Sequence, residues 1–375
     1  MKNEIALTIK PTMLCNMKCK HCFNGDTLDS AEILDAESAC KAIRLACKSY
    51  ENVKITFHGG EPSLAGYDFY IKIFDCKRNL EKEFGTKFRF FFTTNGVLLG
   101  GALLDLLIQN DVVLNISYDG PCNDILRENS ALVLNNILQA KKKGAKIRIF
   151  CTLSKGSAER LMEIYEWFKK ENLNFKTLPI EKRGYAECKS QLIMKPEVLV
   201  DNFADVYKYW LKDKENTIHF YTFEEFASLR RTKQFKPFWF NREIALNPNG
   251  KLYPFGRPND IQFELAKIDT LEDLESCFNS RMYQKLLLRL YALQDKFCRC
   301  CESKGVCNGV VICMSYMYVE SEELLGYSCR QSSQIFSEIL KINDSVIKDI
   351  KSGNTQLYSE FAINKFKDVL EGNKE

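Results

Sequence analysis

The sequence has no apolar run of the ~18 residues that a membrane-spanning helix requires. Its best stretch, near residues 97–108, is interrupted by Asp105. The first ten residues alternate in the manner of a strand and lack the apolar core of a signal peptide. The formal net charge is only +4 over 375 residues. Proteins that bind the nucleic-acid backbone usually have a much larger excess of basic residues. These absences predict a cytoplasmic protein whose partners include no membrane and no nucleic acid.

Cysteine is abundant instead, with 16 residues of this type. In a reducing compartment, thiols in such number indicate metal binding rather than disulfides. Cys15, Cys19 and Cys22 follow a Cys-x3-Cys-x2-Cys spacing. An iron–sulfur cubane normally takes four thiolates. A compact trio with no nearby fourth cysteine therefore predicts a [4Fe-4S] cluster with one open iron, which can bind a small molecule. The alternative is a zinc site or three buried thiols, although structural zinc usually has four ligands.

Strand-like and helix-like segments alternate through roughly the first 215 residues. The expected strands are 5–9, 53–57, 88–93, 112–117, 146–152 and 174–179, with helices such as 36–49, 68–83 and 157–171 between them. Such alternation is typical of parallel βαβ units. A Rossmann sheet should open with a Gly-x-Gly-x-x-Gly turn, which is absent. The sequence therefore predicts an α/β fold built as a partial (β/α)6 barrel.

Polar and glycine residues follow successive expected strands, at the ends where parallel barrels gather their chemistry. They are His58–Pro62, Thr93–Gly96 and Ser117–Gly120. A Gly-Gly turn lets the backbone approach a ligand closely. Carboxylate, amide and hydroxyl groups here can bind an ammonium, a ribose or a carboxylate. Each turn alone is ordinary, but together behind the cysteine trio they indicate a ligand site.

The trio and these turns together resemble the radical S-adenosylmethionine (SAM) enzymes. In that family the open iron takes the amino and carboxylate groups of SAM, and electron transfer from the cluster releases a 5′-deoxyadenosyl radical. The resemblance implies a set of SAM-contacting residues, namely Gly59, Gly60, Glu61, Thr94, Asn95, Ser117, Asp119 and Arg127.

Each part of this set has an implied role. The Gly59-Gly60-Glu61 turn would hold the methionyl amino group. Ser117 and Asp119 would face the ribose or carboxylate, and Thr94 and Asn95 would line the pocket. Arg127, in an Asp-x-x-Arg pattern, would bind the methionyl carboxylate through two hydrogen bonds from its guanidinium. The alternative is that Arg127 is simply exposed to solvent.

A second cysteine group lies near the carboxyl terminus. Cys298, Cys301, Cys307 and the distal Cys329 can place four thiolates around an auxiliary [4Fe-4S] cluster, with Cys313 as an alternate ligand. Zinc suits the same four residues and is the alternative. The group resembles the SPASM extension of radical SAM enzymes that modify peptides and proteins, a pattern of seven cysteines that serves two auxiliary clusters.

The sequence departs from that pattern at three places. Phe255 stands where a cysteine is expected, Phe238-Trp239-Phe240 lies where the cysteine before Gly250 should be, and five residues rather than three separate Cys307 from Cys313. We therefore expect one auxiliary cluster, and two clusters in all.

The expected domains are a radical SAM barrel over 1–230, a SPASM-like auxiliary cluster domain over 231–332 and a helical tail over 333–375. In the tail, apolar residues recur at helical spacing over 335–350, and a second helix is expected over 361–370. Packing of the tail on the host domain is favoured over a partner-binding role.

The predicted function is that of a radical SAM oxidoreductase that matures a peptide, as in the biosynthesis of ribosomally made, modified peptides. It would abstract a hydrogen atom to form a thioether, a crosslink or an epimer, with flavodoxin or ferredoxin as reductant. A formylglycine-generating sulfatase maturase is the first alternative; Phe255-Gly256 replaces the Cys-Asp pair, and with it the proposed base, that the resemblance would require. The second is a non-enzymatic iron–sulfur sensor or scaffold.

Overall fold

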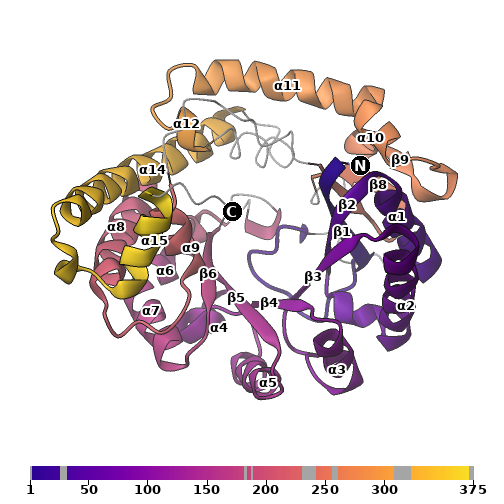
Figure 1. Ribbon diagram of the computed structural model, residues 1–375, viewed down its shortest axis with the longest axis horizontal. Coiled ribbons are helices and arrows are strands. Elements are labelled where there is room, and N and C mark those ends of the chain that lie inside the picture. The colour runs from indigo at the N-terminus through magenta and orange to yellow at the C-terminus, as the bar shows by residue number, and fades with distance from the viewer. Residues whose placement is uncertain are drawn as a thin grey trace. The chain divides into compact units, whose positions relative to one another are not determined.

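The computed structural model describes residues 2–25, 32–180, 184–186, 189–229, 242–255, 261–307 and 322–370 (Figure 1). The chain divides into two compact units. The first comprises Met1–Tyr118, Arg127–Arg148 and Trp239–Tyr291, and the second comprises Asp119–Leu126, Ile149–Phe238 and Ala292–Glu375. This division does not test the expected domain boundaries near residues 230 and 332, which remain predictions.

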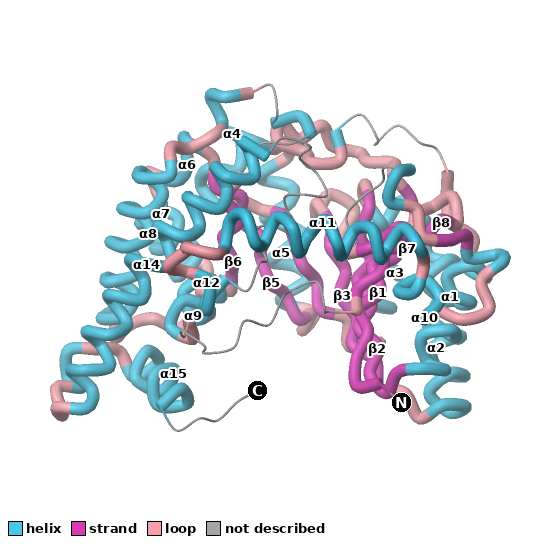
Figure 2. The backbone as a smooth tube through the Cα atoms, turned by 90° about the horizontal axis from the view of Figure 1, so that it is seen from above, coloured by secondary structure: helices cyan, strands magenta, loops and turns pink. Residues whose placement is uncertain are grey.

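A largely parallel sheet forms the centre of the first unit. Its strands are β1 (Lys2–Thr12), β2 (Tyr50–Gly59), β3 (Lys87–Thr94), β4 (Val113–Ser117), β7 (Glu243–Leu246), β8 (Lys251–Pro254) and β9 (Ala266–Lys267). They lie in the order β4-β3-β2-β1-β7-β8-β9. The pairs from β4 to β7 are parallel, and β8 and β9 are antiparallel. Figure 2 shows β1, β2 and β3 side by side.

Alternation along β1 gives its two faces different chemistry. Ile5, Leu7 and Ile9 are almost fully buried on one face. Thr8 and Lys10 occupy the other face and are also buried. Because side chains alternate with a period of two along a strand, the polar pair shares a face that the apolar residues do not reach.

In the first unit, α1 (Ala36–Ser49), α2 (Tyr67–Phe84), α3 (Gly101–Gln109) and α5 (Ser130–Lys142) follow the parallel strands, as in a βαβ chain. The unit also contains α10 (Glu275–Asn279) and the part of α11 (Arg281–Cys298) up to Tyr291. The α1 helix begins with Asp35, whose carboxylate accepts a hydrogen bond of 2.7 Å from the Ser38 backbone N–H. Such a cap satisfies one of the unpaired amides at a helix start. Its buried face consists mostly of alanine, Ile43 and Leu45.

The second unit contains β5 (Lys146–Leu153) from Ile149 onward, which pairs in parallel with β6 (Phe175–Pro179). Its helices are α4 (Asn123–Leu126), α6 (Lys155–Ala158), α7 (Leu161–Lys170), α8 (Pro196–Lys212), α9 (Tyr221–Ala227), α12 (Lys304–Cys307), α14 (Glu322–Lys351) and α15 (Glu360–Leu370). A column of stacked aromatic rings forms its core. Phe175 lies with its ring centroid 4.4 Å from that of Phe168 and 4.0 Å from that of Phe220.

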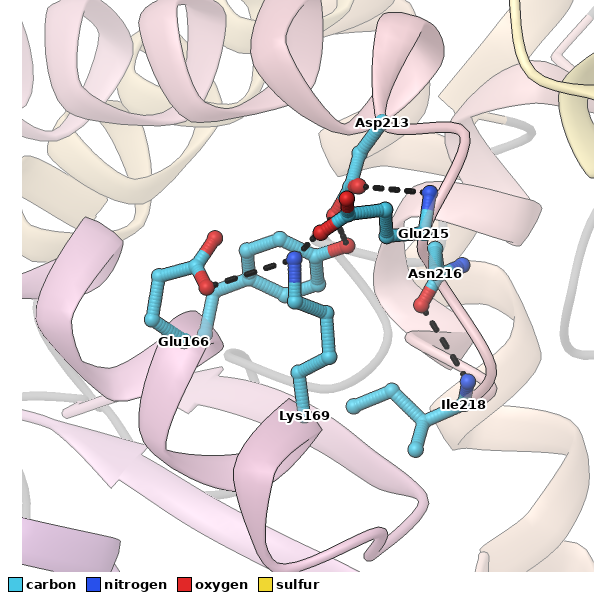
Figure 3. A network of polar contacts seen from close by, with 7 residues as sticks. Glu166, Lys169, Asp213, Glu215, Asn216 and Ile218 are labelled. Atoms are coloured by element: carbon cyan, nitrogen blue, oxygen red, sulfur yellow. Dashed lines mark hydrogen bonds and ion pairs between the residues drawn. The ribbon is translucent and has the colours of Figure 1, made fainter.

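The turn after α8 is fixed by a network around Asp213 (Figure 3). The Lys169 ammonium donates to Asp213 Oδ2 at 2.8 Å and lies 3.3 Å from Glu166 Oε2. Asp213 Oδ1 accepts from the Glu215 backbone N–H at 3.0 Å, and Tyr165 donates to Oδ2 at 2.6 Å. Since the Asp213 side chain is only 5% exposed, this carboxylate joins α7 to the turn with little solvent screening.

The helical tail belongs to the second unit. Tyr207 on α8 donates to Asn343 Oδ1 on α14 at 2.7 Å, and the Asn343 amide donates to the Phe226 carbonyl at 2.8 Å. Asn343 is 1% exposed. The tail therefore packs on its host unit, as expected from the sequence, through a buried polar link as well as its apolar face.

The predicted secondary structure is confirmed. All six expected strands are present, and the helices expected near residues 36–49, 68–83, 335–350 and 361–370 correspond to α1, α2, α14 and α15. The helix expected over 157–171 is instead divided into the end of α6 and α7, with Glu159 and Arg160 between them. The α/β class with a parallel sheet is correct. Of the helices in the described ranges, none has the length and apolar character needed to cross a bilayer.

Candidate functional site

The cysteine loop leaves the carboxyl end of β1 and turns back on itself. The Cys22 backbone N–H donates to the Cys19 carbonyl, and the Gly25 N–H donates to the Cys22 carbonyl, both at 3.2 Å. Cys15, Cys19 and Cys22 are each half-buried, and none is in a disulfide. Tight turns of this kind keep three thiols within one short loop.

Gly59, which ends β2, and Gly60, which follows it, lie against this loop. A Cβ on Gly59 would meet the Thr12 carbonyl oxygen at 2.4 Å, and one on Gly60 would meet the Leu14 carbonyl oxygen at 2.1 Å. The Gly60 N–H donates to the Thr12 carbonyl at 3.1 Å, and the Glu61 N–H donates to the Leu14 carbonyl at 2.7 Å. The sequence suggested that glycine here admits a ligand. The close neighbour is the backbone of the cysteine loop, and a ligand contact stays a prediction.

The Glu61 side chain fastens the end of β2 to the end of β3. It is fully buried, and its Oε1 accepts from Ser63 Oγ at 2.7 Å and Thr94 Oγ1 at 2.9 Å. Its Oε2 accepts from the Asn95 backbone N–H at 2.7 Å. Burial raises the pKa of the Glu61 carboxyl, and these donors oppose that rise. The carboxylate thus has a positioning role between the two turns.

Asn95 connects the turn after β3 to the cysteine loop. Its Nδ2 donates to Asn16 Oδ1 at 2.7 Å and to Cys15 Sγ at 3.8 Å. Its Oδ1 accepts from the Val97 N–H at 3.0 Å. Burial raises the pKa of the Cys15 thiol, while the Asn95 amide favours the thiolate. An N–H donor aimed at sulfur stabilises the ionised form that binds iron.

Arg127 lies beside the trio rather than in solvent. Its Nη1 donates to Cys19 Sγ at 3.8 Å, and its Nη2 lies 3.3 Å from His21 Nε2. Burial raises the pKa of the Cys22 thiol, and the guanidinium charge of Arg127 opposes that rise. The arginine therefore supplies positive charge where thiolates must form.

Ser117 and Asp119 have different surroundings from one another. Ser117 is half-buried at the end of β4. Asp119, in the second unit, is fully buried, and its Oδ1 accepts from the Thr152 backbone N–H at 2.6 Å. Its own N–H donates to Asn123 Oδ1 at 3.0 Å. At least one oxygen of this carboxylate therefore serves the fold, and its contact with a ribose stays a prediction.

The donors around the trio fit an iron–sulfur cluster. A cubane takes its thiolate ligands on different irons, and here three thiols lie on one loop, with Asn95 and Arg127 donating to two of the sulfurs. Within the ranges that the structure describes, no group of three or more His, Cys, Asp or Glu side chains could hold a single metal ion.

Residues 9–178 match the family model described as the Radical SAM superfamily. This part of the chain is a radical SAM domain. It contains the cysteine trio, all three turns and Arg127, so the recognition from sequence is confirmed.

Known proteins resemble the chain beyond this domain. The cysteine-type anaerobic sulfatase-maturating enzyme of Clostridium perfringens is 24% identical over 232 residues, which are 56% of this chain and 61% of that enzyme. The match thus spans less than two thirds of that relative's length. The structure of native anSMEcpe with bound AdoMet and the Cp18Cys peptide superposes with a TM-score of 0.75 at 18% identity, covering 92% of this chain and 99% of that one.

A third similar protein is SuiB of Streptococcus suis, in its structure bound to the precursor peptide SuiA. It superposes with a TM-score of 0.59 at 18% identity, covering 76% of this chain and 66% of SuiB. At such identities a structural likeness shows the fold alone. The expected barrel of the radical SAM domain is thereby confirmed.

Two buried polar residues of the radical SAM domain were not predicted from the sequence motifs. Lys10 on β1 is 1% exposed, and Asn115 on β4 is 5% exposed. Asn115 Oδ1 has no hydrogen-bond partner among the described residues. Asn115 interrupts the otherwise apolar run 112–116, whereas Lys10 belongs to a strand with several other polar residues, and no motif contains either.

The carboxyl-terminal cysteines Cys298, Cys301, Cys307 and Cys329 lie within electrostatic reach of one another in the second unit. Burial and the neighbouring thiols raise the pKa of Cys298 to about 11 and that of Cys329 to about 12. The Cys301 thiol also lies 3.7 Å from Ser333 Oγ. The four residues are thus brought together from α11, the turn that follows it, α12 and α14. Cys313 lies outside the described residues.

Phe255 occupies the position where the SPASM pattern has a cysteine. It ends the hairpin of β7 and β8, is 2% exposed and has a φ of +58°. Its ring centroid lies 6.2 Å from that of Tyr283 on α11. Gly256 and Phe238-Trp239-Phe240 lie outside the described residues. An aromatic ring, not a metal ligand, therefore fills this position.

Proposed function

We propose that the protein is a radical SAM maturase that modifies a residue of a peptide or protein substrate. The observation that carries this proposal is that three segments meet within a radical SAM domain. They are the cysteine loop after β1, the turn with Glu61 after β2 (residues 58–62, the Glu61 turn) and the turn with Asn95 after β3 (residues 93–96, the Asn95 turn). The resemblance to a sulfatase-maturating enzyme and to SuiB, both in structures with bound peptides, supports a peptide as substrate.

Cys15, Cys19 and Cys22 would hold a [4Fe-4S] cluster and leave one iron open to SAM. When bound, the cluster and SAM supply the 5′-deoxyadenosyl radical that takes a hydrogen atom from the substrate. The chain's own residues orient these groups. Asn95 and Arg127 donate toward the sulfurs, and the Arg127 guanidinium would also bind the methionyl carboxylate.

The Glu61 turn would contact the methionyl amino group through its backbone, since its carboxylate already accepts from four donors. Gly59, Gly60, Thr94, Ser117 and Asp119 complete the proposed SAM-binding set.

A second [4Fe-4S] cluster would be held by Cys298, Cys301, Cys307 and Cys329, with Cys313 as the alternate ligand. Their mutual electrostatic effect supports this assignment, because thiols this close repel as thiolates unless a metal binds them. The enzyme would act as an oxidoreductase and receive electrons from a flavodoxin or ferredoxin.

We favour a thioether, a carbon–carbon crosslink or an epimer as the product. A formylglycine maturase would need a base near Phe255-Gly256, and neither side chain can accept a proton. Buried Phe255 makes this part of the β7–β8 hairpin apolar. A reaction that ends by radical recombination or hydrogen return is compatible with such surroundings.

The first experiment is anaerobic reconstitution, reduction with dithionite, addition of SAM and detection of 5′-deoxyadenosine by mass spectrometry. Cys15→Ala should abolish the product. Cys277→Ala removes a buried cysteine outside both proposed sets and should leave it unchanged. Equal yields from the wild-type protein and Cys15→Ala would contradict the proposed function.

The second experiment identifies the product class. Small peptides encoded beside the gene, and a sulfatase-derived cysteine peptide, are incubated with the reduced enzyme and SAM. A thioether or crosslink lowers the peptide mass by one hydrogen molecule, and an epimer is found by chiral amino-acid analysis. Formation of a hydrazone with an aldehyde reagent would instead identify formylglycine and overturn our choice.

A further inference from the structure

Two cysteines outside both proposed cluster sets lie on the helices that follow β1 and β2 and line the same pocket. Cys40 lies on α1 and Cys76 on α2, and both are half-buried. They line one surface pocket, together with Glu37, Lys41, Arg44 and Lys72 among others. Neither belongs to a cysteine spacing typical of metal binding. The pocket therefore brings together two thiols that the radical SAM chemistry does not use.

The two thiols are neighbours in this pocket. The Cys40 thiol lies 3.9 Å from the carbonyl oxygen of Lys72, which stands one helical turn before Cys76 on α2. A hydrogen bond between the two thiols is the largest influence on the pKa of each. Because α1 and α2 pack against each other within one unit, the backbone already holds both residues in place.

The charges around the pair favour one thiolate. The hydrogen bond from Cys40 and the positive charge of Arg44 lower the pKa of Cys76. The same contact raises the pKa of Cys40, and Asp35 and Glu37 act in the same direction. The thiolate is the nucleophile in disulfide exchange, so Cys76 is the attacking sulfur and Cys40 the resolving one.

We propose that Cys40 and Cys76 are a reversible oxidation site that closes into a disulfide linking α1 to α2. With oxidised glutathione as oxidant, the Cys76 thiolate attacks one glutathione sulfur and releases one glutathione thiolate. The Cys40 thiol then loses its proton to solvent, and its sulfur displaces the second glutathione from Cys76. Two protein thiols thereby give up two electrons and two protons, and one glutathione disulfide becomes two glutathione molecules.

Peptide mapping of the full chain tests this proposal directly. The anaerobically reconstituted protein is treated with oxidised glutathione, remaining thiols are blocked with N-ethylmaleimide, and the protein is digested with trypsin and Glu-C without reduction. Cleavage after Glu37 and Lys41 isolates Cys40 from Cys22, and cleavage after Lys72 and Lys77 isolates Cys76. The linked pair of these two peptides should rise at least tenfold over the untreated protein and disappear after reduction.

Serine variants provide the controls. Cys40→Ser and Cys76→Ser should each abolish the linked pair, and Cys40→Ser should leave Cys76 carrying glutathione because the resolving thiol is gone. Cys47→Ser, which changes a fully buried cysteine on the same helix, should leave the linked pair unchanged. Recovery of Cys40 and Cys76 each blocked by maleimide, each carrying its own glutathione, or Cys76 joined to Cys47 would overturn the proposal.

Discussion

Replacing Gly60 with alanine should disrupt the cysteine loop without any change to a cysteine. A Cβ at this position would lie 2.1 Å from the Leu14 carbonyl oxygen and 2.4 Å from the Met13 carbonyl oxygen. Both neighbours are backbone atoms, so no side-chain rotation can relieve the contact. Gly60 has no positive φ, so the effect is steric and not a matter of backbone conformation.

The size of the effect follows from the distances. The nearest oxygen is more than an ångström closer than the 3.4 Å at which ordinary contact begins. The loop must therefore move away and stretch two hydrogen bonds, from Gly60 to Thr12 and from Glu61 to Leu14. Overpacking costs about 1–3 kcal/mol, and each weakened hydrogen bond costs about 1 kcal/mol. A total of roughly 3 kcal/mol corresponds to about a hundredfold loss of the closed loop.

The assay compares iron content and the rate of 5′-deoxyadenosine formation in Gly60→Ala and Gly100→Ala. Gly100 is a matched control because its φ of 174° is extended and a Cβ there meets nothing within 4 Å. We expect Gly60→Ala to lose the iron of the first cluster and about a hundredfold in rate. The Gly100→Ala variant should match the wild-type protein in both.

Two results would refute this reasoning. Full iron and full rate in Gly60→Ala would mean that the loop does not need the close approach to β2. An equal loss in Gly100→Ala would mean that any alanine near these turns is harmful. A thermal unfolding scan of both variants separates local loss of the cluster from global unfolding.

Three further perturbations test other parts of the structure. Glu61→Gln should lower the free energy of unfolding by about 1–3 kcal/mol, because either amide orientation points an NH2 group at a donor; urea denaturation measures this. Asp213→Asn should cost about 2 kcal/mol at neutral pH. Burial alone would raise the pKa of Asp213, but the hydrogen bonds from Lys169 and Tyr165 outweigh this effect, so the pKa in the folded protein lies below the ordinary value of 3.8. The ionised carboxylate therefore contributes its full stabilisation above the ordinary pKa, and this contribution is lost as the pH falls through the pKa of the folded protein. Cys329→Ala should reduce the iron content from about eight to about four per chain, measured by iron analysis.

Each of these has an outcome that would contradict it. An unchanged urea midpoint in Glu61→Gln would mean that the carboxylate is protonated and donates one of its bonds. A difference between wild-type and Asp213→Asn proteins that persists well below the ordinary pKa would assign the effect to packing. About twelve irons in the wild-type protein would mean that a third cluster exists. Cys300→Ala, at an exposed cysteine beside the second group, controls for Cys329→Ala and should retain all iron.

The strands and the meeting of the motifs could be predicted from the sequence. The segment 53–57 was recognisable as a strand because its apolar residues lie between polar neighbours, and it forms the middle of β2. The carboxyl ends of parallel strands meet at one edge. The cysteine loop, the glycine turn and the Asn95 turn were therefore expected together, and hydrogen bonds between them are present.

The partners of individual side chains could not be predicted. The register of β1 and β2 shifts between Ile9 and Thr12, and this irregularity brings the loop carbonyls onto Gly59 and Gly60. No pattern in the sequence encodes such a shift. Likewise Asp119 could equally face a ligand or a backbone amide, and only the position of the Thr152 N–H decides that one oxygen is engaged.

The conformation of Phe255 bears on the number of clusters. The other non-glycine residues with positive φ in the described ranges are Asp111, Asn129 and Asn172, types that tolerate this region. For phenylalanine the cost is about 1–3 kcal/mol. Burying the ring contributes about 3 kcal/mol or more, by comparison with Phe→Ala truncations. Burial therefore outweighs strain, and the hairpin keeps its sharp end with an apolar side chain at the position where a cysteine would bind iron. The Phe255 ring lies near Tyr283 and offers no ligand side chain at this position, so a single auxiliary cluster stays the prediction.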